Sequence, residues 1–114
     1  MSKRRQGDIW MANLNPNYKS EIGKVRPVVI VQTDKLNDYH TSTIICPLST
    51  RIFEVTPVRV KLNKRESGLD QPSEILIDQI RAIDNSRFKK KIGSINKDSL
   101  IKVKDLLKKI LDID

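Results

Sequence analysis

The sequence predicts a single domain over residues 1–114, mainly β with α: a small, strongly bent antiparallel sheet or barrel followed by one helix. Short apolar segments recur along most of the chain and are separated by turn signals, as is typical of strands. After residue 96 the apolar spacing changes to that of an amphipathic helix. A chain of 114 residues suits one domain with one core. Short strands with one terminal helix therefore favour the bent sheet.

The strand expected at 25–32 contains the clearest core signal in the chain. The run Val28–Val31 is entirely branched and apolar, which is typical of a strand buried on both faces. Pro27 has no N–H, so we expect it at the start of this strand or on a sheet edge.

Further strands are expected where apolar residues alternate between turn residues. They cover residues 7–14, 42–48, 53–62, 74–80 and 89–95. In segment 53–62, side-chain alternation should put Val58, Val60 and Leu62 on one face, with Arg59 and Lys61 on the other. The polar segment 33–41 should hold a turn or a short helix.

The last segment is expected to form the helix, with Asn96 as its N-cap. An apolar stripe recurs at helical spacing and consists of Leu100, Val103, Leu106, Leu107, Ile110 and Leu111. The stripe predicts packing against the core; a surface for a partner is the alternative.

Composition excludes several classes of protein. Hydrophobic residues make up 38% and charged residues 32% of the chain, which is ordinary for a soluble globular protein. No apolar run approaches the roughly 18 residues of a membrane span, and the basic N-terminus has no apolar segment behind it, so it is not a secretory signal. One cysteine, Cys46, and one histidine, His40, cannot form a typical structural zinc site. We therefore expect no cofactor or metal, a cytoplasmic location, and a buried, inert Cys46 thiol.

The net charge points to polyanionic partners. Twenty-two Lys and Arg residues against 14 Asp and Glu residues give +8, which favours nucleic acid or anionic membranes. Aromatic residues make up only 4% of the chain, which argues against a broad base-stacking platform.

The loop before the Val28–Val31 run places charged residues beside a rigid strand. Glu21, Lys24 and Arg26 lie around Gly23, which gives the backbone room to turn. The proline that follows Arg26 favours an extended backbone there, so the guanidinium can be aimed from the mouth of the strand. The alternative is an ordinary surface arginine beside a carboxylate.

Five motifs in order resemble the MazF/PemK-like toxins of bacterial toxin–antitoxin pairs, from about residue 7 to 94. They are Gly7-Asp8-Ile9-Trp10, Asn15-Pro16, Ser20-Glu21 with Gly23 and Arg26-Pro27-Val28-Val29, Pro47-Leu48-Ser49, and Asp78-Gln79-Ile80-Arg81-Ala82-Ile83-Asp84. The resemblance implies the CcdB/PemK-like toxin fold, an SH3-like barrel of about five to seven strands with a C-terminal helix. It also implies a homodimer, an antitoxin whose disordered acidic tail covers the RNA site, and metal-independent, sequence-specific cleavage of single-stranded RNA.

The chain departs from the family pattern at three positions. Lys19 stands where glycine is usual, Ile22 where glutamine is usual, and Ser49 where threonine is typical. The hydroxyl group survives at Ser49, so catalysis should survive. The other two departures fall in the loop and could change the RNA sequence preference.

RNA can be cleaved without metal because its 2′-OH is a nucleophile already beside the phosphorus. Arg26 is the candidate for stabilising the phosphoryl charge, with Ser49 as a hydrogen-bond donor to the same phosphate. The resemblance places Arg26 at the catalytic centre, where it could also serve as the acid. Glu21 is the candidate base, or it orients Arg26 and a nucleotide; an ion pair at the surface is its alternative role.

A second group of residues is expected to contact the RNA. It consists of Ser20, Lys24, Thr50, Asp78, Gln79, Arg81, Asp84 and Arg87. Within it, Arg81 would hold a phosphate or a base, and Asp84 would accept a hydrogen bond or orient Arg81. A structural salt bridge is an equally good account of Asp84.

Two other functions compete with RNA cleavage. The CcdB toxins, which poison DNA gyrase, share the implied fold, and fold does not determine function. The net charge would also suit an RNA-binding regulator that does not cleave. An arginine placed to stabilise a phosphate, followed by a hydroxyl, favours the endoribonuclease, whose partners would be single-stranded RNA, a cognate antitoxin and a second copy of the chain.

Overall fold

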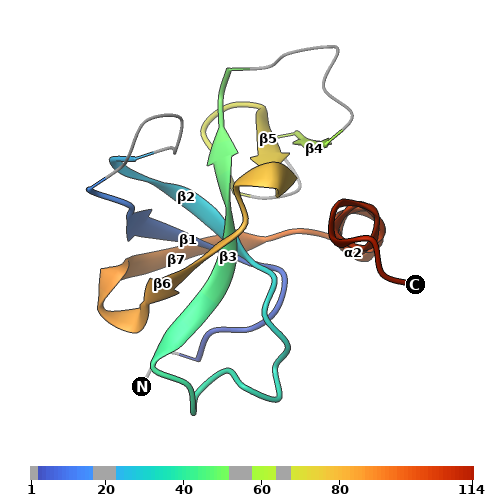
Figure 1. Ribbon diagram of the computed structural model, residues 1–114. Coiled ribbons are helices and arrows are strands. Elements are labelled where there is room, and N and C mark those ends of the chain that lie inside the picture. Colours follow the sequence, from blue (N-terminus) through green and yellow to red (C-terminus); the bar gives the residue numbers. More distant parts are fainter. Residues whose placement is uncertain (1–2, 17–22, 52–57, 64–67) are drawn as a thin grey trace.

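The computed structural model describes residues 3–16, 23–51, 58–63 and 68–114, which form a bent sheet with a helix at one side (Figure 1). The strands in these ranges are β1 (Asp8–Asn13), β2 (Val25–Ile30), β3 (Ser42–Ser49), β4 (Arg59–Leu62), β5 (Ser73–Leu76), β6 (Arg81–Asp84) and β7 (Phe88–Ser94). Two 3-10 turns, η1 (Ile77–Gln79) and η2 (Asn85–Arg87), flank β6, and helix α2 (Lys97–Leu111) follows β7.

Strand β3 is the centre of the sheet. The strand order is β4-β5-β3-β2-β1-β7, and β6 also pairs with β3. The N-terminal part of β3 pairs with β6, whereas Leu48 and Ser49 at its other end pair with β5. All pairings are antiparallel, and Figure 1 shows β3 running across the molecule with β4 and β5 at one end. The bent antiparallel sheet with a C-terminal helix confirms the predicted fold class.

Two hydrophobic clusters cover the two sides of the central strands. Ile9, Val29 and Cys46 belong to a cluster that includes Val103 of α2. Neighbouring residues on the same strands belong to a second cluster around Trp10. We call the first side the helix face and the second the Trp10 face. Because Val28, Val29 and Ile30 are each 0% exposed, the prediction of a strand buried on both faces is confirmed.

Pro27 lies where β2 has only one neighbour. It pairs with Met11 of β1, whereas the pairing of β2 with β3 begins at Val28. The missing N–H therefore costs no ladder hydrogen bond on the β3 side, as expected for a proline at the edge of the sheet.

The helix begins as predicted but is buried along only part of its stripe. The side chain of Asn96 accepts a 2.8 Å hydrogen bond from the backbone N–H of Ser99, which confirms the N-cap. Val103 is fully buried against the sheet. Ile110 and Leu111, however, are 37% and 53% exposed, so the C-terminal end of the stripe lies at the surface.

The strands expected at 7–14, 42–48 and 89–95 are confirmed to within one residue at each end, and residues 33–41 form turns. The second strand ends at Ile30, because the N–H groups of Val31 and Gln32 both bond to the carbonyl of Ile44 and break the regular register. No helix in the described ranges has the length and apolar character required to cross a bilayer.

Two predicted strands were wrong in extent. The fourth begins at Arg59, because Val58 lies in a turn; residues 53–57 of that prediction lie outside the described residues. The fifth ends at Leu76, where η1 begins. A straight strand over 74–80 could not pair with both ends of β3, whereas η1 carries the chain past Cys46 and Pro47 to a new strand, β6.

Candidate functional site

Arg26 is held at the open end of β2. It pairs with Ala12 in the ladder, and its Nε donates a 2.8 Å hydrogen bond to the carbonyl of Gly23. Partial burial lowers the pKa of the guanidinium. Because the anchoring bond uses Nε, the two terminal nitrogens remain to bind an acceptor such as a phosphate.

Ser49 lies across the sheet from Arg26. The ladder pairs Val28 with Pro47, and the same register continued by two residues brings Ser49 opposite Arg26. Ser49 points to the Trp10 face, because its neighbour Leu48 lies in the cluster on the helix face. Arg26 points to the Trp10 face as well, because Val28, two residues along the same strand, belongs to the cluster there. The Ser49 hydroxyl oxygen accepts a 3.1 Å hydrogen bond from the N–H of Arg51.

Arg81 is a second guanidinium on the Trp10 face. It pairs with Ile45 of β3 and shares its side of β6 with the buried Ile83. Its Nη1 is buried and has no hydrogen-bond partner among the described residues. A buried donor without an acceptor is costly, so this nitrogen is suited to an acceptor from a ligand.

Asp84 does not orient Arg81, so that part of the prediction is wrong. The two residues lie three apart on one strand and therefore point to opposite faces. Asp84 instead caps η2 by accepting a 2.9 Å hydrogen bond from the N–H of Ser86. Hydrogen bonds from Ser86 also lower the pKa of the Asp84 carboxyl.

Arg87 braces the end of β1. Its Nη1 donates a 3.0 Å hydrogen bond to the carbonyl of Asn13 and a second bond to the carbonyl of Asn15. This structural role accounts for the position of Arg87; contact with RNA stays a prediction.

Four of the remaining predicted site residues are described by the structure. Lys24 has a positive φ of 69° and leads into β2, with its N–H bonded to the side chain of Asn15 at 2.8 Å. Thr50 directly follows Ser49 and is exposed, and η1 carries the exposed Asp78 and the half-buried Gln79. Ser20 and Glu21, with the departures at Lys19 and Ile22, lie outside the described residues.

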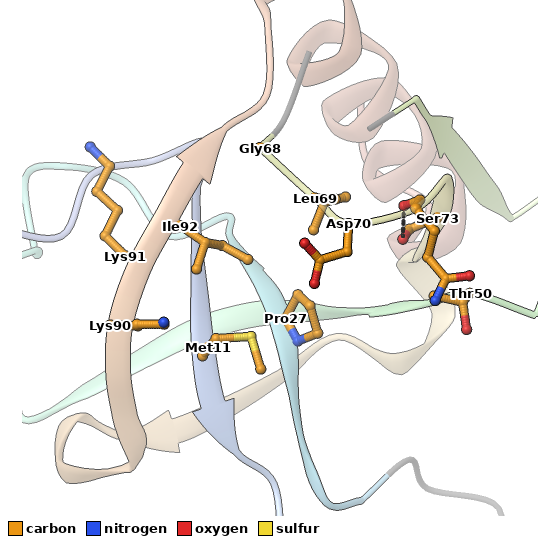
Figure 2. A pocket seen from close by; sticks show the side chains of 11 residues that line it. Met11, Pro27, Thr50, Gly68, Leu69, Asp70, Ser73, Lys90, Lys91 and Ile92 are labelled. Carbon is orange, nitrogen blue, oxygen red and sulfur yellow. Dashed lines mark hydrogen bonds between the residues drawn. The ribbon is translucent and has the colours of Figure 1, made fainter. Parts of the chain in front are cut away.

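A pocket of about 590 Å³ opens on the helix face, behind Arg26 and Ser49. Its lining includes Pro27 and Thr50, the next residues along the chain from that pair. Figure 2 shows β7, with Lys90, on one side of this pocket and the segment bearing Leu69 and Asp70 on the other. Consecutive strand residues point to opposite faces, so the pocket and the Arg26 guanidinium lie on opposite sides of the same strand.

A buried ion pair beside Ser49 was missed by the sequence interpretation. Glu74 of β5 is 1% exposed and lies 3.1 Å from the Nη1 of Arg59 on β4. Glu74 pairs directly with Ser49 in the β3–β5 ladder. The sequence carries little signal for this pair, because Glu74 follows Ser73 at the polar start of the expected strand 74–80. A buried carboxylate needs a partner, but only the sheet shows that Glu74 is buried.

Comparison with known proteins decides the family. A profile of the PemK-like, MazF-like toxins of type II toxin–antitoxin systems matches residues 5–111. The chain belongs to this family. Endoribonuclease MazF of Staphylococcus epidermidis is 38% identical over 104 residues, which are 90% of this chain and 87% of that protein.

Solved structures of MazF proteins share the fold. MazF of Deinococcus radiodurans (crystal form I) superposes with a TM-score of 0.87 at 23% identity and covers 99% of this chain and 100% of that one. A MazE–MazF structure from the same organism (form II) gives a TM-score of 0.82 at 22% identity, with 100% of both chains covered. The resemblance to MazF/PemK-like toxins and the fold that it implies are therefore confirmed.

Proposed function

We propose that this MazF-like toxin is an endoribonuclease that cleaves single-stranded RNA, such as mRNA, in a sequence-specific manner. The observation that carries the proposal is the placement of Arg26, Ser49 and Arg81 on one face of the sheet, with the Arg81 Nη1 buried and lacking an acceptor among the described residues. A relative 38% identical is named an endoribonuclease, which supports the same activity.

The reaction is an attack of the ribose 2′-OH on the adjacent phosphorus. The 2′-O–P bond forms and the P–O5′ bond breaks, leaving a 2′,3′-cyclic phosphate and a 5′-OH. The terminal nitrogens of Arg26 stabilise the charge that grows on the phosphoryl oxygens, and the Ser49 hydroxyl donates a hydrogen bond to one of them. Glu21 takes the proton from the 2′-OH.

Arg26 acts mainly through its charge. An arginine side chain ordinarily stays protonated at neutral pH, with a pKa above about 12. Burial lowers the pKa of Arg26, the direction that a proton donor to the 5′-oxygen would need. Arg26 therefore acts first by stabilising the charge on the phosphoryl oxygens and second by donating a proton to the departing 5′-oxygen.

The same proposal includes protein partners. A MazF neighbour in the fold comparison forms a structure with MazE, which supports an antitoxin that binds this chain. The net charge of +8 would attract the acidic, disordered tail expected of such an antitoxin. We further propose a homodimer, which light scattering coupled to size-exclusion chromatography would detect as twice the chain mass.

The decisive experiment incubates the purified protein with end-labelled single-stranded RNA and matched DNA in excess EDTA. Arg26→Ala is run beside it, with Lys104→Ala as the control that removes one charge from the exposed side of α2. RNA-only cleavage that leaves a 2′,3′-cyclic phosphate and is lost in Arg26→Ala supports the proposal. Cleavage that EDTA abolishes would overturn the metal-independent chemistry.

Intact RNA across several diverse sequences would contradict the nuclease. A gyrase supercoiling assay and an RNA-binding assay would then separate the remaining alternatives, a gyrase poison of the same fold and a non-cleaving RNA-binding regulator.

A further inference from the structure

We propose that Glu74 and Arg59 are positioning residues for the Ser49 hydroxyl. The inference rests on the proposed function, because it assigns a catalytic purpose to a buried ion pair on two neighbouring strands. Neither residue needs to touch the RNA. Their effect is transmitted through the backbone of one residue, Arg51, to the side chain of Ser49.

A continuous chain of polar contacts joins the buried carboxylate to the hydroxyl. Glu74 Oε1 accepts a 3.1 Å hydrogen bond from Arg59 Nη1. The same nitrogen donates to the carbonyl of Arg51 at 3.2 Å. The N–H of Arg51 in turn donates to the Ser49 hydroxyl oxygen at 3.1 Å. Arg51 is thus held at both its carbonyl and its N–H, and we call these contacts the Glu74 relay.

Burial makes the start of the relay rigid. The Glu74 and Arg59 side chains are only 2% and 17% exposed. A buried carboxylate cannot exchange its cationic partner for water without a large loss of free energy. Glu74 is also the direct ladder partner of Ser49. The residues at the two ends of the relay therefore lie opposite each other on adjacent strands.

The relay determines where the Ser49 hydroxyl hydrogen can point. A hydroxyl oxygen has two acceptor lone pairs and one donor, and the Arg51 N–H occupies one lone pair. The O–H can then be directed outward to a phosphoryl oxygen. Serine needs such a restraint more than threonine does, because it lacks the branching methyl group that stiffens χ1.

Glu74→Gln tests the relay, since it keeps the shape of the side chain and removes its charge. We expect kcat on a single-stranded RNA to fall about 10-fold while KM changes less than about 2-fold, because small errors of position act on the transition state. Lys61→Gln is the matched control: Lys61 pairs with Glu74 in the β4–β5 ladder and lies outside the relay. It should leave kcat unchanged.

A double-mutant cycle separates positioning from general loss of stability. In a Ser49→Ala background the effect of Glu74→Gln on kcat should shrink to less than about 2-fold, because the group being positioned is gone. In a Ser49→Thr background it should also shrink. If Glu74→Gln still lowers kcat about 10-fold in both backgrounds, the inference is overturned. If Glu74→Gln does not fold, Arg59→Lys, which keeps the charge and loses the planar fork, takes its place in the same cycle.

A readout independent of activity distinguishes this inference from the proposed function. Three-bond NMR couplings of Ser49 should report a single χ1 rotamer in the wild-type protein and averaging in Glu74→Gln. A single rotamer in both proteins would refute the relay even if RNA is cleaved. If Glu74→Gln changes these couplings but the wild-type protein cleaves no RNA, the relay is kept and the nuclease is refuted.

Discussion

At the scale of single residues, two side chains have environments that determine their chemistry. Arg26 is bound to the Gly23 carbonyl through Nε, and this bond does not use its two terminal nitrogens. Cys46 is fully buried in the hydrophobic cluster on the helix face of the sheet. Each environment leads to an experiment.

Replacing Arg26 by lysine should impair cleavage much more than RNA binding. Lysine keeps the charge but cannot reproduce both the Nε bond and a planar contact with the phosphate. We expect single-turnover cleavage to fall by about 10²–10³-fold, as for the loss of one preorganised donor. Binding of an RNA with a 2′-deoxy nucleotide at the cleavage site, measured by anisotropy, should stay within about 3-fold because a positive charge remains. Cleavage at more than a tenth of the wild-type rate would contradict the assigned role.

The Cys46 thiol should be unreactive in the folded protein. Burial raises the pKa of Cys46 to about 12, so the thiolate needed for reaction is almost absent at neutral pH. A disulfide reagent at pH 8 should label the protein only in denaturant. Rapid labelling of the native protein would show that Cys46 is more accessible than its burial implies.

The same pKa predicts a loss of stability in alkali. The unfolded thiol ionises near pH ~8.5, whereas the folded thiol ionises only at about 12. Between these values the unfolded state releases a proton that the folded state keeps, so the free energy of unfolding falls as pH rises. Urea unfolding from pH 8 to pH 10 should show a smaller decline in Cys46→Ala than in the wild-type protein.

At the scale of elements, Gly68 brings the start of the 68–72 segment close to β7. Gly68 has a φ of +69°, and a Cβ atom there would lie 2.5 Å from the carbonyl oxygen of Ile92. This segment lines the pocket behind the site. Its close approach to the strand is therefore what shapes the pocket wall opposite Lys90.

Gly68→Ala should destabilise the fold. The positive φ alone costs about 1 kcal/mol for a residue with a side chain, and the clash with backbone adds to it. Gly7→Ala is the matched control, because Gly7 also has a positive φ, of 91°, but an added Cβ would meet only side-chain atoms at 3.7 Å or more. Urea unfolding should show a larger loss for Gly68→Ala; equal losses would mean that the segment moves away from β7 without cost.

At the scale of the whole molecule, positive charge exceeds negative charge by 8. Such a balance attracts any polyanion, so sequence preference has to come from local contacts and not from the general field. The Nη1 of Arg81 is buried and has no hydrogen-bond partner in the described part of the chain, so it suits a local contact of this kind.

RNA binding should weaken as salt increases, with a contribution from Arg81 that can be separated from the rest. Each phosphate contact to a single strand adds about 0.7 to the slope of log affinity against log salt. If Arg81 holds a phosphate, Arg81→Ala should reduce the slope by about that amount; if it holds a base, the slope stays and the cleavage pattern becomes less selective. Lys104→Ala provides the control, and a variant indistinguishable from wild type in both measurements would remove Arg81 from the site.

The sequence by itself determined the strands that carry the core, the capped helix and the extended backbone at Arg26. These follow from local properties: the branched run Val28–Val31, the N-cap side chain of Asn96, and the proline after Arg26. Only the tertiary structure decided that Arg81 shares a face with Arg26 while Asp84 does not, and that Glu74 meets Arg59 from another strand. Periodicity and capping depend on residues that are close together in the sequence. Strand pairing joins residues far apart in the chain, and its register depends on the packing of the whole sheet.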